Sequence, residues 1–368
     1  MSGDFRFADS FGPSRIIHIH RPSAGLRAIL VVDNTACGIA IGGVRMAPDV
    51  SLDECFHLAR AMTFKNAAAG LPHGGGKSVI CEDPRMPLEK KEGLIRAFAQ
   101  SIRDIADYVP GPDMGTDELC MGWVKDEIGR AAGLPAAVGG IPLDELGATG
   151  YGLAACIDVA RRFIDLDLNG ARVVVQGFGA VGKHAARFLA EKGARLIAAS
   201  DTSGTVIDER GIEVAALIAH KDAGGTVRDY QQGKKDTVDA VIDVACDIWI
   251  PAARPNVINE DNVARLKTRM VPQGANIPCT PRAEELLRQR GILVVPDFIA
   301  NAGGVICASV EYHGGTASTA FQLIDEKIRA NTQAVLSDSR RKEITPRAAS
   351  QAYAISRIKA AAATRRWQ

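Results

Sequence analysis

The sequence predicts an α/β protein of two domains, the second of them built on a parallel, doubly wound sheet. Three observations lead to this expectation. The chain has 368 residues, more than one hydrophobic core usually supports. From residue 171 onward, short apolar runs alternate with helix-like stretches, which is typical of parallel sheets covered by helices. Between 134 and 150 the chain is rich in Gly, Pro and Ala, which indicates the crossing between domains.

We expect the first domain, also α/β, over residues 1–140 and the second over 141–330. The tail from about 323 to 364 is rich in Ala, Arg and Lys and has a helical pattern. It is longer than the second sheet needs, so residues 331–368 are expected to pack back on the first domain.

The clearest helix signals in the first half lie over 51–70. Ser51 can cap this helix, Glu54 completes a capping box, and Gly70 and Pro72 end it before a glycine-rich loop. The other expected elements of this half are a strand over 26–32 and a helix over 89–107. In the second half we expect a helix over 180–192 and strands over 172–176, 195–200, 239–244, 247–250, 269–273 and 292–295.

Composition and charge argue against several classes of protein. Apolar residues make up 46%, charged residues 24%, and the formal net charge is +1, so there is no electrostatic case for nucleic acid or an anionic membrane. No apolar run reaches the roughly 18 residues of a spanning helix, and the N-terminus lacks a signal-peptide pattern. The eight cysteines form no CxxC pair and the seven histidines show no ligand spacing. We expect a cytoplasmic protein with free thiols and no metal.

A GxGxxG pattern stands in VVVQGFGAVG, after a strand and at the start of a helix. In this setting the glycines permit a tight turn, close approach of a pyrophosphate and close helix–strand packing. The helix N-terminus then faces the phosphates. A glycine turn that only packs is the alternative, but the full context favours a dinucleotide site. The residues expected to hold the cofactor are Gly177, Gly179, Ala180, Val181 and Gly182.

Asp201 ends the second strand of this unit and can accept hydrogen bonds from the ribose hydroxyls. The same carboxylate would repel a 2′-phosphate, and no arginine follows it before Arg210. The sequence therefore favours NAD over NADP.

Two lysines, Lys65 and Lys77, bracket the helix end and the glycine-rich loop. A P-loop does not explain GGGKS, because the first glycine of that motif would have to stand at Leu71. Most lysines are solvated surface charges, but Lys65 lies among apolar residues, where an unpartnered charge would be costly. Asp113, in VPGPDMGTDE, could take part in a site or simply cap a turn.

Taken together and in order, several segments resemble the glutamate/leucine/phenylalanine/valine dehydrogenase family. They cover nearly the whole chain and read GGVRMAP, MTFKNAAAGLPHGGGK, GPDMGTDE, GATGYG, QGFGAVG, IPAA, GAN and PDFIANAGGV. The resemblance implies a substrate and oligomerisation domain, a Rossmann-type nucleotide domain and a cleft between them. It also implies a homo-oligomer that reversibly converts an L-amino acid into its 2-oxo acid and ammonia.

The resemblance further assigns roles to single residues. Lys77 corresponds to the catalytic lysine, Asp113 to the acid/base aspartate, and Lys65 to the lysine that binds the substrate carboxylate. With its pKa lowered by burial and a neighbouring cation, Lys77 can activate the water that attacks the substrate iminium, while Asp113 moves protons. The residues implied at the substrate and nicotinamide end of the cleft are Thr149, Asn276 and Asn301.

Glutamate-specific members of the family carry a lysine directly before the GG of the first motif and a serine three residues after the valine of NAGGV. Here these positions hold Ile41 and Ala308. Burying a second carboxylate there without a partner would be costly, so an apolar substrate of the leucine, valine or phenylalanine class is expected. The expected side-chain site comprises Ile41, Gly42, Gly111, Val305 and Ala308.

Two alternatives remain open. One is a glutamate dehydrogenase with an altered side-chain pocket, which GPDMGTDE and PDFIANAGG favour. The other is a catalytically inactive, NAD-binding sensor, against which the presence of Lys65, Lys77 and Asp113 speaks. Lys65 also speaks against an amine dehydrogenase, because that substrate has no carboxylate.

Overall fold

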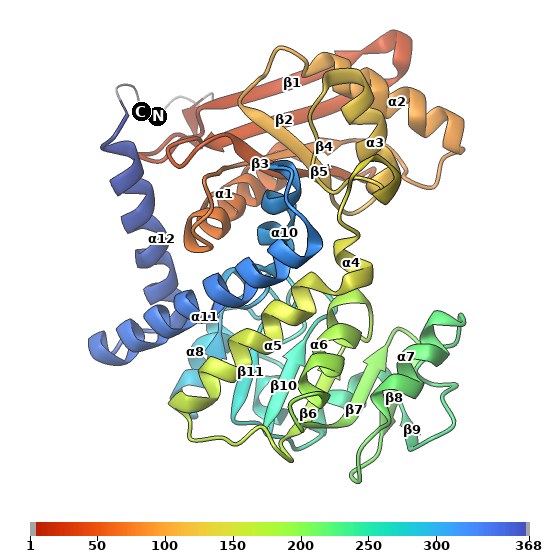
Figure 1. Ribbon diagram of the computed structural model, residues 1–368, viewed down its shortest axis with the longest axis vertical. Coiled ribbons are helices and arrows are strands. Elements are labelled where there is room, and N and C mark those ends of the chain that lie inside the picture. The colour runs from red at the N-terminus through yellow and green to blue at the C-terminus, as the bar shows by residue number, and fades with distance from the viewer. Residues whose placement is uncertain (1–4, 366–368) are drawn as a thin grey trace. The chain divides into compact units, whose positions relative to one another are not determined.

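The computed structural model describes residues 5–365, in which the chain forms two compact units (Figure 1). Unit 1 comprises the described residues up to Pro142, then Val305–Ala320, then the described residues from Gln351 onward. Unit 2 comprises Leu143–Gly304 and Phe321–Ser350. Each unit combines a sheet with helices, which confirms the predicted two-domain α/β fold.

Unit 1 is built on a mixed sheet of five strands. They are β1 (Arg15–Arg21), β2 (Leu26–Asn34), β3 (Ala40–Met46), β4 (Gly74–Ile80) and β5 (Tyr108–Pro112). Their order is β1-β2-β4-β3-β5, which makes β1 and β5 the edges. β2 pairs antiparallel with β1 and β4, whereas β3 is parallel to both β4 and β5. The expected strand over 26–32 is confirmed as β2.

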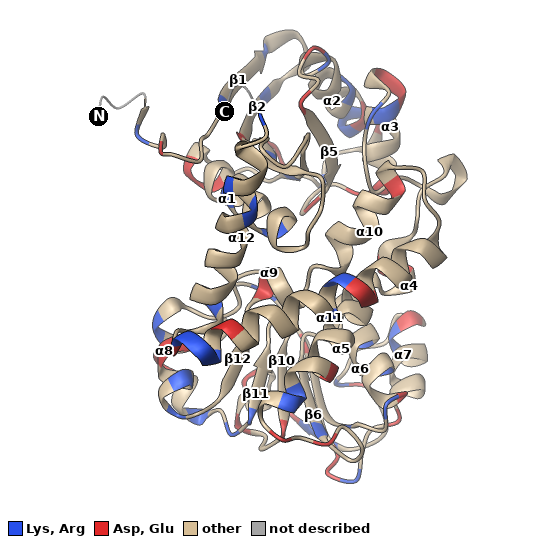
Figure 2. Cartoon of the chain, turned by 60° about the vertical axis from the view of Figure 1, so that its left-hand side comes forward, with Lys and Arg blue, Asp and Glu red and all other residues tan. Residues whose placement is uncertain are grey.

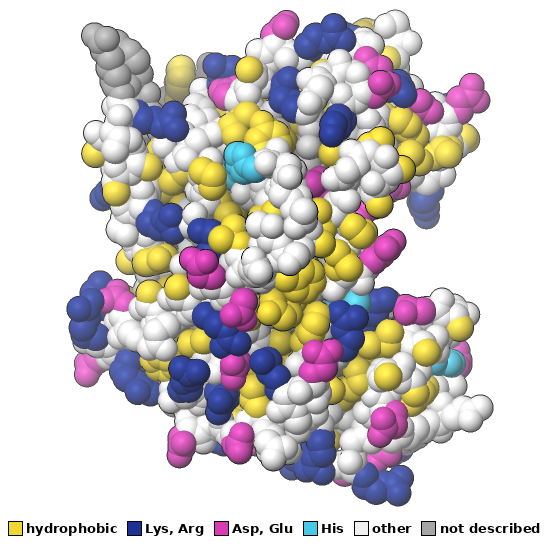
Figure 3. Space-filling model, in the orientation of Figure 1, with side chains coloured by type: hydrophobic (Ala, Val, Ile, Leu, Met, Phe, Trp, Pro, Cys, Tyr) yellow, Lys and Arg dark blue, Asp and Glu magenta, His cyan; other side chains and the backbone are white. Residues whose placement is uncertain are grey.

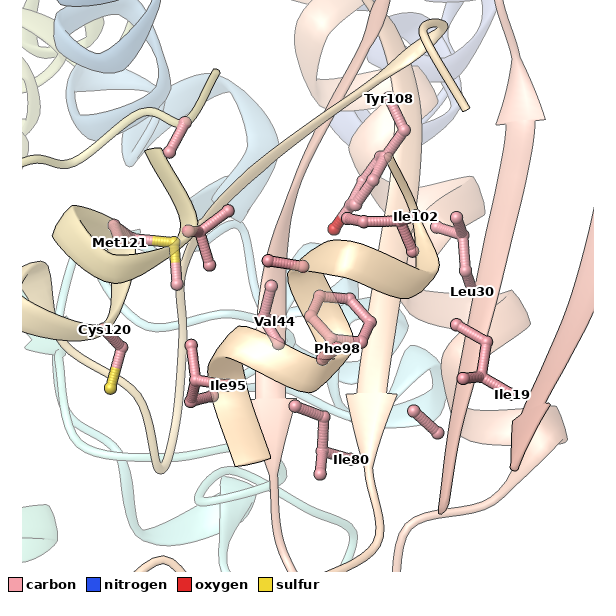
Figure 4. Packing of buried hydrophobic residues seen from close by; sticks show 14 of the residues in the cluster. Ile19, Leu30, Val44, Ile80, Ile95, Phe98, Ile102, Tyr108, Cys120 and Met121 are labelled. Carbon is pink, nitrogen blue, oxygen red and sulfur yellow. The ribbon is translucent and has the colours of Figure 1, made fainter. Parts of the chain in front are cut away.

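Helices cover both faces of this sheet. They are α1 (Leu52–Ala68) on one face and α2 (Leu88–Ser101) with α3 (Glu118–Ile128) on the other. Successive residues of β2 point to opposite faces, so Leu30 packs with α2 and α3 while Val31 packs with α1. Figure 4 shows Ile95 and Phe98 of α2 beside Val44 of β3 in the larger core.

The helix boundaries of unit 1 follow local signals. Ser51 caps α1 as predicted, because its hydroxyl accepts a hydrogen bond from the Glu54 N–H at 3.2 Å. α2 ends at Ser101 and not at 107. The side chain of Arg130 donates to the carbonyl oxygens of Ile102 at 2.8 Å and Ile105 at 2.9 Å, and these bonds stabilise a turn in place of further helix.

The glycine-rich segment after α1 is a strand, β4, and not the expected loop. A Cβ at Gly75 would lie 2.1 Å from the backbone nitrogen of Thr63 in α1, and a Cβ at Gly74 would lie 1.9 Å from the Asn34 carbonyl oxygen of β2. Glycine therefore allows α1 and β2 to approach β4 more closely than any side chain would permit. As a result, Lys77 projects from a buried strand.

Unit 2 is built on a sheet of seven strands. They are β6 (Arg172–Gln176), β7 (Arg195–Asp201), β8 (Gly204–Ile207), β9 (Lys234–Asp236), β10 (Ile248–Pro251), β11 (Met270–Pro272) and β12 (Leu293–Val295). Their order is β12-β11-β10-β6-β7-β8-β9. The first five are parallel, and the winding reverses between β10 and β6, where such sheets commonly bind ligands.

A wholly parallel sheet is expected from the sequence, and this expectation is wrong at one edge. β8 pairs antiparallel with β7, and β9 antiparallel with β8. Only Thr202 and Ser203 separate β7 from β8, and so short a connection can join only antiparallel strands.

Helices flank the sheet of unit 2. They are α4 (Leu143–Leu146), α5 (Ala148–Ala160), α6 (Ala180–Ala190), α7 (Val214–Asp222), α8 (Pro281–Gln289) and α9 (Asp297–Ala300). The strand expected over 239–244 is wrong, because this segment is a 3-10 helix, η5 (Val238–Asp243). Arg265 binds both Asp239 at 3.0 Å and Asp243 at 2.7 Å, which favours helical spacing of the two carboxylates. A short apolar run alone does not distinguish a strand from a helix.

The C-terminal helices differ from the expectation for 331–368. They are α10 (Gly303–Tyr312), α11 (Ala317–Lys342) and α12 (Pro346–Ala362). Phe321–Ser350 belongs to unit 2, where Arg329 binds Asp158 of α5 at 2.7 Å and Arg347 binds Glu284 of α8 at 2.6 Å. The chain joins unit 1 again only from Gln351 onward.

Charged residues of both signs occur along the helices (Figure 2). On the face drawn in Figure 3, Lys and Arg side chains are intermingled with Asp and Glu. This distribution agrees with the net charge of +1. Among residues 5–365, no helix is both long and apolar enough to cross a membrane.

Candidate active site

The site residues expected from the sequence fall into two sets, one in each unit. Unit 1 holds Ile41, Gly42, Lys65, Lys77, Asp113, Val305 and Ala308. Unit 2 holds Thr149, Gly177, Gly179, Ala180, Val181, Gly182, Asp201, Asn276 and Asn301.

Lys77 and Asp113 form a buried ion pair across β3. Lys77 lies on β4 and is 6% exposed, while Asp113 follows the last residue of β5. Gly43 of β3, the strand between them, leaves room for the pair. A Cβ at Gly43 would lie 2.7 Å from the Asp113 Cβ and 3.0 Å from the Lys77 Nζ. The structure therefore brings together the two residues expected to be catalytic.

A tight turn fixes the backbone of Asp113. Its carbonyl accepts from the Thr116 N–H at 2.9 Å, and its N–H donates to the Thr116 hydroxyl at 3.0 Å. That hydroxyl donates to the carbonyl of Val44 in β3 at 2.7 Å. The Thr116 hydroxyl thus serves the turn, which leaves the Asp113 carboxylate to face Lys77.

Arg45 extends the ion pair and was not expected there from the sequence. Its Nε donates to the Asp113 carboxylate at 3.3 Å and its Nη1 donates to Glu54 at 2.6 Å. Arg45 follows Gly43 by two residues in β3, so both lie on one face of the sheet. Alternation along a predicted strand could have revealed this. The result is a chain of alternating charges: Lys77, Asp113, Arg45 and Glu54.

This environment shifts the pKa of both candidate catalytic groups, Lys77 and Asp113. Burial lowers the pKa of Lys77, the Asp113 charge opposes that change, and the Arg45 charge reinforces it. Burial alone would raise the pKa of Asp113, but the charges of Lys77 and Arg45 outweigh it and hold that pKa below its usual value. Asp113 is therefore ionised at neutral pH, and Lys77 gives up its proton more readily than a surface lysine.

Lys65 lies in the last turn of α1 and is partly exposed. The expected desolvation among apolar neighbours is thus weaker than its sequence context indicates. The next residue, Asn66, is buried and donates to the Gly74 carbonyl of β4 at 2.6 Å. This hydrogen bond fixes the end of α1 beside the strand that carries Lys77.

Ile41 and Ala308 belong to one apolar cluster, named here the Ile41 cluster. Its buried members are Ile41, Val109 and Ala132, with Ile39, Ala308 and Tyr312 packed against them. Val305 precedes Ala308 by three residues in α10 and so lies on the same side of that helix. Gly42 has no room for a side chain, because a Cβ there would lie 1.6 Å from the Gly76 carbonyl oxygen.

The glycine turn of unit 2 fits a dinucleotide. Gly177 has φ +91°, and a Cβ at this position would lie 2.7 Å from the backbone of Ala253. A Cβ at Gly182 would lie 2.1 Å from the Gly177 carbonyl oxygen, so α6 packs directly on the turn. A Cβ at Gly179 would meet nothing within 4 Å, which leaves the side where a pyrophosphate approaches open. Ala180 and Val181 begin α6, at the end that favours phosphate.

The carboxylate of Asp201 is already fully engaged. One oxygen accepts from the N–H of Ser203 at 2.8 Å and from its hydroxyl at 2.5 Å. The other accepts from the Lys221 ammonium at 2.6 Å and from the Val227 N–H at 2.9 Å. Burial opposes the ionised form, but these bonds outweigh it and lower the pKa of Asp201 to about 2. Lys221 follows Asp201 by 20 residues, on α7, and was not expected at this site from the sequence.

Asn301 and Asn276 lie together at the end of α9. The amide NH₂ of Asn301 donates to the Asn276 side-chain oxygen at 3.1 Å and to the carbonyl of Gly274 at 3.2 Å. The Asn301 side-chain oxygen is buried and has no hydrogen-bond partner among the described residues, so it can accept from a bound molecule. Thr149 lies at the start of α5 and faces Gly304. A Cβ at Gly304 would lie 2.9 Å from the Thr149 hydroxyl.

All eight cysteines are free thiols. Within residues 5–365, no group of three or more His, Cys, Asp or Glu side chains could hold a metal ion.

Comparison with known proteins agrees with this geometry. The family described as Glutamate/Leucine/Phenylalanine/Valine dehydrogenase matches residues 139–366, and its dimerisation domain matches residues 13–130. These matches identify an oxidoreductase of the amino-acid dehydrogenase class. The chain belongs to the Glu/Leu/Phe/Val dehydrogenase family.

Three relatives illustrate the similarity. A glutamate dehydrogenase of Aeropyrum pernix is 38% identical over 322 residues, which cover 82% of this chain and 77% of the relative. An NADP-specific glutamate dehydrogenase of Saccharolobus shibatae is 40% identical, covering 76% of this chain and 69% of the relative. The structure of a hetero-hexameric glutamate dehydrogenase of Thermus thermophilus, in a Leu-bound form, has a TM-score of 0.84 at 27% identity, covering 95% of this chain and 89% of that one.

Proposed function

We propose that this protein catalyses the reversible oxidative deamination of an L-amino acid to its 2-oxo acid and ammonia. The observation that carries the proposal is the buried Lys77–Asp113 pair beside Gly43, extended by Arg45. A dinucleotide held at the glycine turn of unit 2 supplies the hydride acceptor. The family match supports this class of reaction.

In this proposal Lys77 is the base. Its lowered pKa provides a neutral amine that removes a proton from the water attacking the iminium carbon of the substrate. Asp113, which is ionised in the resting site, accepts a proton from the substrate nitrogen, becomes neutral for that step and then returns the proton. Lys65 binds the substrate α-carboxylate, and Asn301 presents its unpartnered side-chain oxygen to a bound donor.

For the substrate, the packing of Ile41 favours an apolar side chain. Ile41 is 6% exposed and lies with Val109, Ala132 and Ala308 in an apolar cluster. A substrate carboxylate placed among these groups would lose its hydration without gaining a charged partner. We propose leucine, valine or phenylalanine as the side-chain class.

Glutamate is the second candidate, and the comparisons favour it over the apolar class. The Aeropyrum and Saccharolobus relatives are both named glutamate dehydrogenases. A glutamate side chain would require a cation near the Ile41 cluster in place of the lysine that glutamate-specific members carry at position 41.

The deciding experiment is dinucleotide reduction with a panel of L-amino acids, using NAD and NADP in parallel. Higher kcat/KM for leucine, valine or phenylalanine than for glutamate supports the apolar site. The reverse order contradicts it and establishes the second candidate. Turnover of none of them, with intact dinucleotide binding, would instead support a non-catalytic sensor.

Arg45 provides a test of the base through pH. Because its charge lowers the Lys77 pKa, Arg45→Gln should raise that pKa and move the acidic limb of kcat/KM to higher pH. Arg45→Lys keeps the cation and should leave the limb nearer to that of the wild type. The measurement is the pH profile of amino-acid oxidation. An unmoved limb in Arg45→Gln would contradict the electrostatic role.

For the cofactor, we propose that both NAD and NADP are accepted. The expected preference for NAD rested on Asp201 repelling a 2′-phosphate, but Lys221 offsets that charge at 2.6 Å. The hydrogen bonds to both Asp201 oxygens also compete with a ribose hydroxyl. The name of the Saccharolobus relative, NADP-specific, agrees with a tolerated 2′-phosphate.

Lys221→Met tests this cofactor site. It removes the cation and leaves Asp201 to repel a 2′-phosphate, so the ratio of kcat/KM for NADP to that for NAD should fall about tenfold or more. Lys234→Met, at an exposed lysine of β9, is the control. A ratio that is equal in wild type and Lys221→Met would exclude Lys221 from the cofactor site.

We also propose that the protein is a homo-oligomer in the cytoplasm. The family description of residues 13–130 as a dimerisation domain supports self-association. The hetero-hexameric assembly of the Thermus glutamate dehydrogenase agrees with an oligomer.

A further inference from the structure

Glu311, near the end of α10, is a buried carboxylate, 7% exposed, that binds backbone amides of one segment. One oxygen accepts from the N–H groups of Gly133 at 2.7 Å and Leu134 at 3.0 Å. The other accepts from the Ile141 N–H at 2.7 Å. Hydrogen bonds from three amides can stabilise a buried carboxylate without a cation. The side chain therefore holds both ends of a segment, named here the 131–141 segment.

The 131–141 segment covers the free edge of β5. The N–H of Ala132 donates to the Pro110 carbonyl at 2.8 Å, at the edge of the sheet that no further strand covers. Gly133, with φ +71°, lies against Pro112: a Cβ there would stand 2.4 Å from the proline Cδ. Asp113 follows Pro112 directly. The segment thus packs along the end of β5, while the Thr116 turn fixes Asp113 itself.

The same segment forms a wall of the Ile41 cluster. Ala132 is buried there with Ile41 and Val109. Ala308, which also packs against this cluster, precedes Glu311 by three residues in α10, so one helix carries both Ala308 and the carboxylate that binds the 131–141 segment. One turn of α10 therefore links Ala308 to the segment that carries Ala132.

We propose that Glu311 is a positioning residue that fixes the width of the amino-acid side-chain site by holding Ala132 in place relative to Ala308. This inference rests on the proposed function, because it takes the Ile41 cluster as the place where the substrate side chain binds. Glu311 touches neither substrate nor cofactor and acts through the 131–141 segment. Its loss frees amides that have no other acceptor in that geometry.

The first part of the test is hydrogen exchange in the intact protein. Glu311→Gln replaces one acceptor oxygen by an NH₂ group, which cannot accept from Ile141 or from Gly133 and Leu134. Exchange in peptides spanning residues 131–141 should become about tenfold faster or more. Glu284→Gln is the matched control, because Glu284 is also buried (9% exposed) but accepts from Arg347 and Gln273 in unit 2.

The second part is substrate selectivity. In Glu311→Gln, the kcat/KM ratio between the best amino acid and its homologue one methylene smaller should fall about fivefold, mainly through KM. The kcat of the best substrate and the acidic limb of the pH profile should stay near wild type, since Lys77 and Asp113 keep their charges. Glu284→Gln should leave the ratio unchanged even where it lowers Tm.

Unchanged exchange in residues 131–141, or faster exchange with unchanged selectivity, would overturn the proposal. If Glu311→Gln does not fold, Glu311→Asp keeps both oxygens and the charge on a shorter arm and is judged by the same two measurements. Failure of the proposed function has a different signature, namely a wild type that turns over no amino acid. In that case the exchange measurement still tests whether Glu311 holds the 131–141 segment.

Discussion

Lys77→Ala is expected to lower kcat for amino-acid oxidation by about 10³-fold or more, within or above the range that general acid–base groups contribute. The variant removes the amine that activates water and leaves the Asp113 carboxylate beside Arg45 alone. Dinucleotide binding should remain near wild type, because the glycine turn belongs to the other unit. Steady-state kinetics and a fluorescence titration with NADH measure the two effects.

Lys90→Ala, at an exposed lysine of α2, is the control for loss of one positive charge. It should leave both kcat and NADH binding unchanged. Normal turnover in Lys77→Ala would exclude the role given to Lys77. Loss of NADH binding along with turnover would indicate damage to the fold and not to the chemistry.

The double variant Ile41→Lys with Ala308→Ser is expected to redirect the enzyme toward glutamate. It supplies the two groups that bind the side-chain carboxylate in glutamate-specific members, at positions that the Ile41 cluster brings together. The ratio of kcat/KM for glutamate to that for leucine should rise by about 10²-fold or more, because a charged partner replaces apolar surface. The amino-acid panel measures this ratio.

Ile41→Leu conserves volume and apolar character, so it should leave glutamate a poor substrate. An unchanged ratio in the double variant would show that these two positions do not contact the substrate side chain. A wild type that already prefers glutamate would show that another cation binds the side-chain carboxylate.

The sequence is most informative where apolar runs and glycine signals coincide. The strand expected over 172–176 matches β6 at both ends, and the helix after it begins at Ala180 as expected. Its buried valines, the sharp turn at Gly177 and the amphipathic helix point to one structure. The opposite holds for β4, whose three glycines have low strand propensity and are explained by what packs against them: β2 at Gly74, α1 at Gly75 and the Tyr108 ring of β5 at Gly76.

Partners distant in sequence limit what could be predicted of the site. Lys77 and Asp113 stand out by motif, but Arg45 becomes part of the site only once β3 lies between β4 and β5. The preference for NAD that Asp201 predicts loses its basis because Lys221, which lies on α7, binds that carboxylate. Single-residue chemistry can be inferred from the sequence, whereas its electrostatic partners depend on tertiary pairing.

Three consecutive positions of β3 differ sharply in the freedom they leave to evolution and engineering. Position 41 carries a side chain, which packs in an apolar cluster. At 42 and 43, even the methyl group of alanine would collide, with the Gly76 backbone in one case and with Asp113 in the other. Libraries that seek new substrates can therefore include position 41, while substitutions at its two neighbours would be removed by selection before any new specificity could arise.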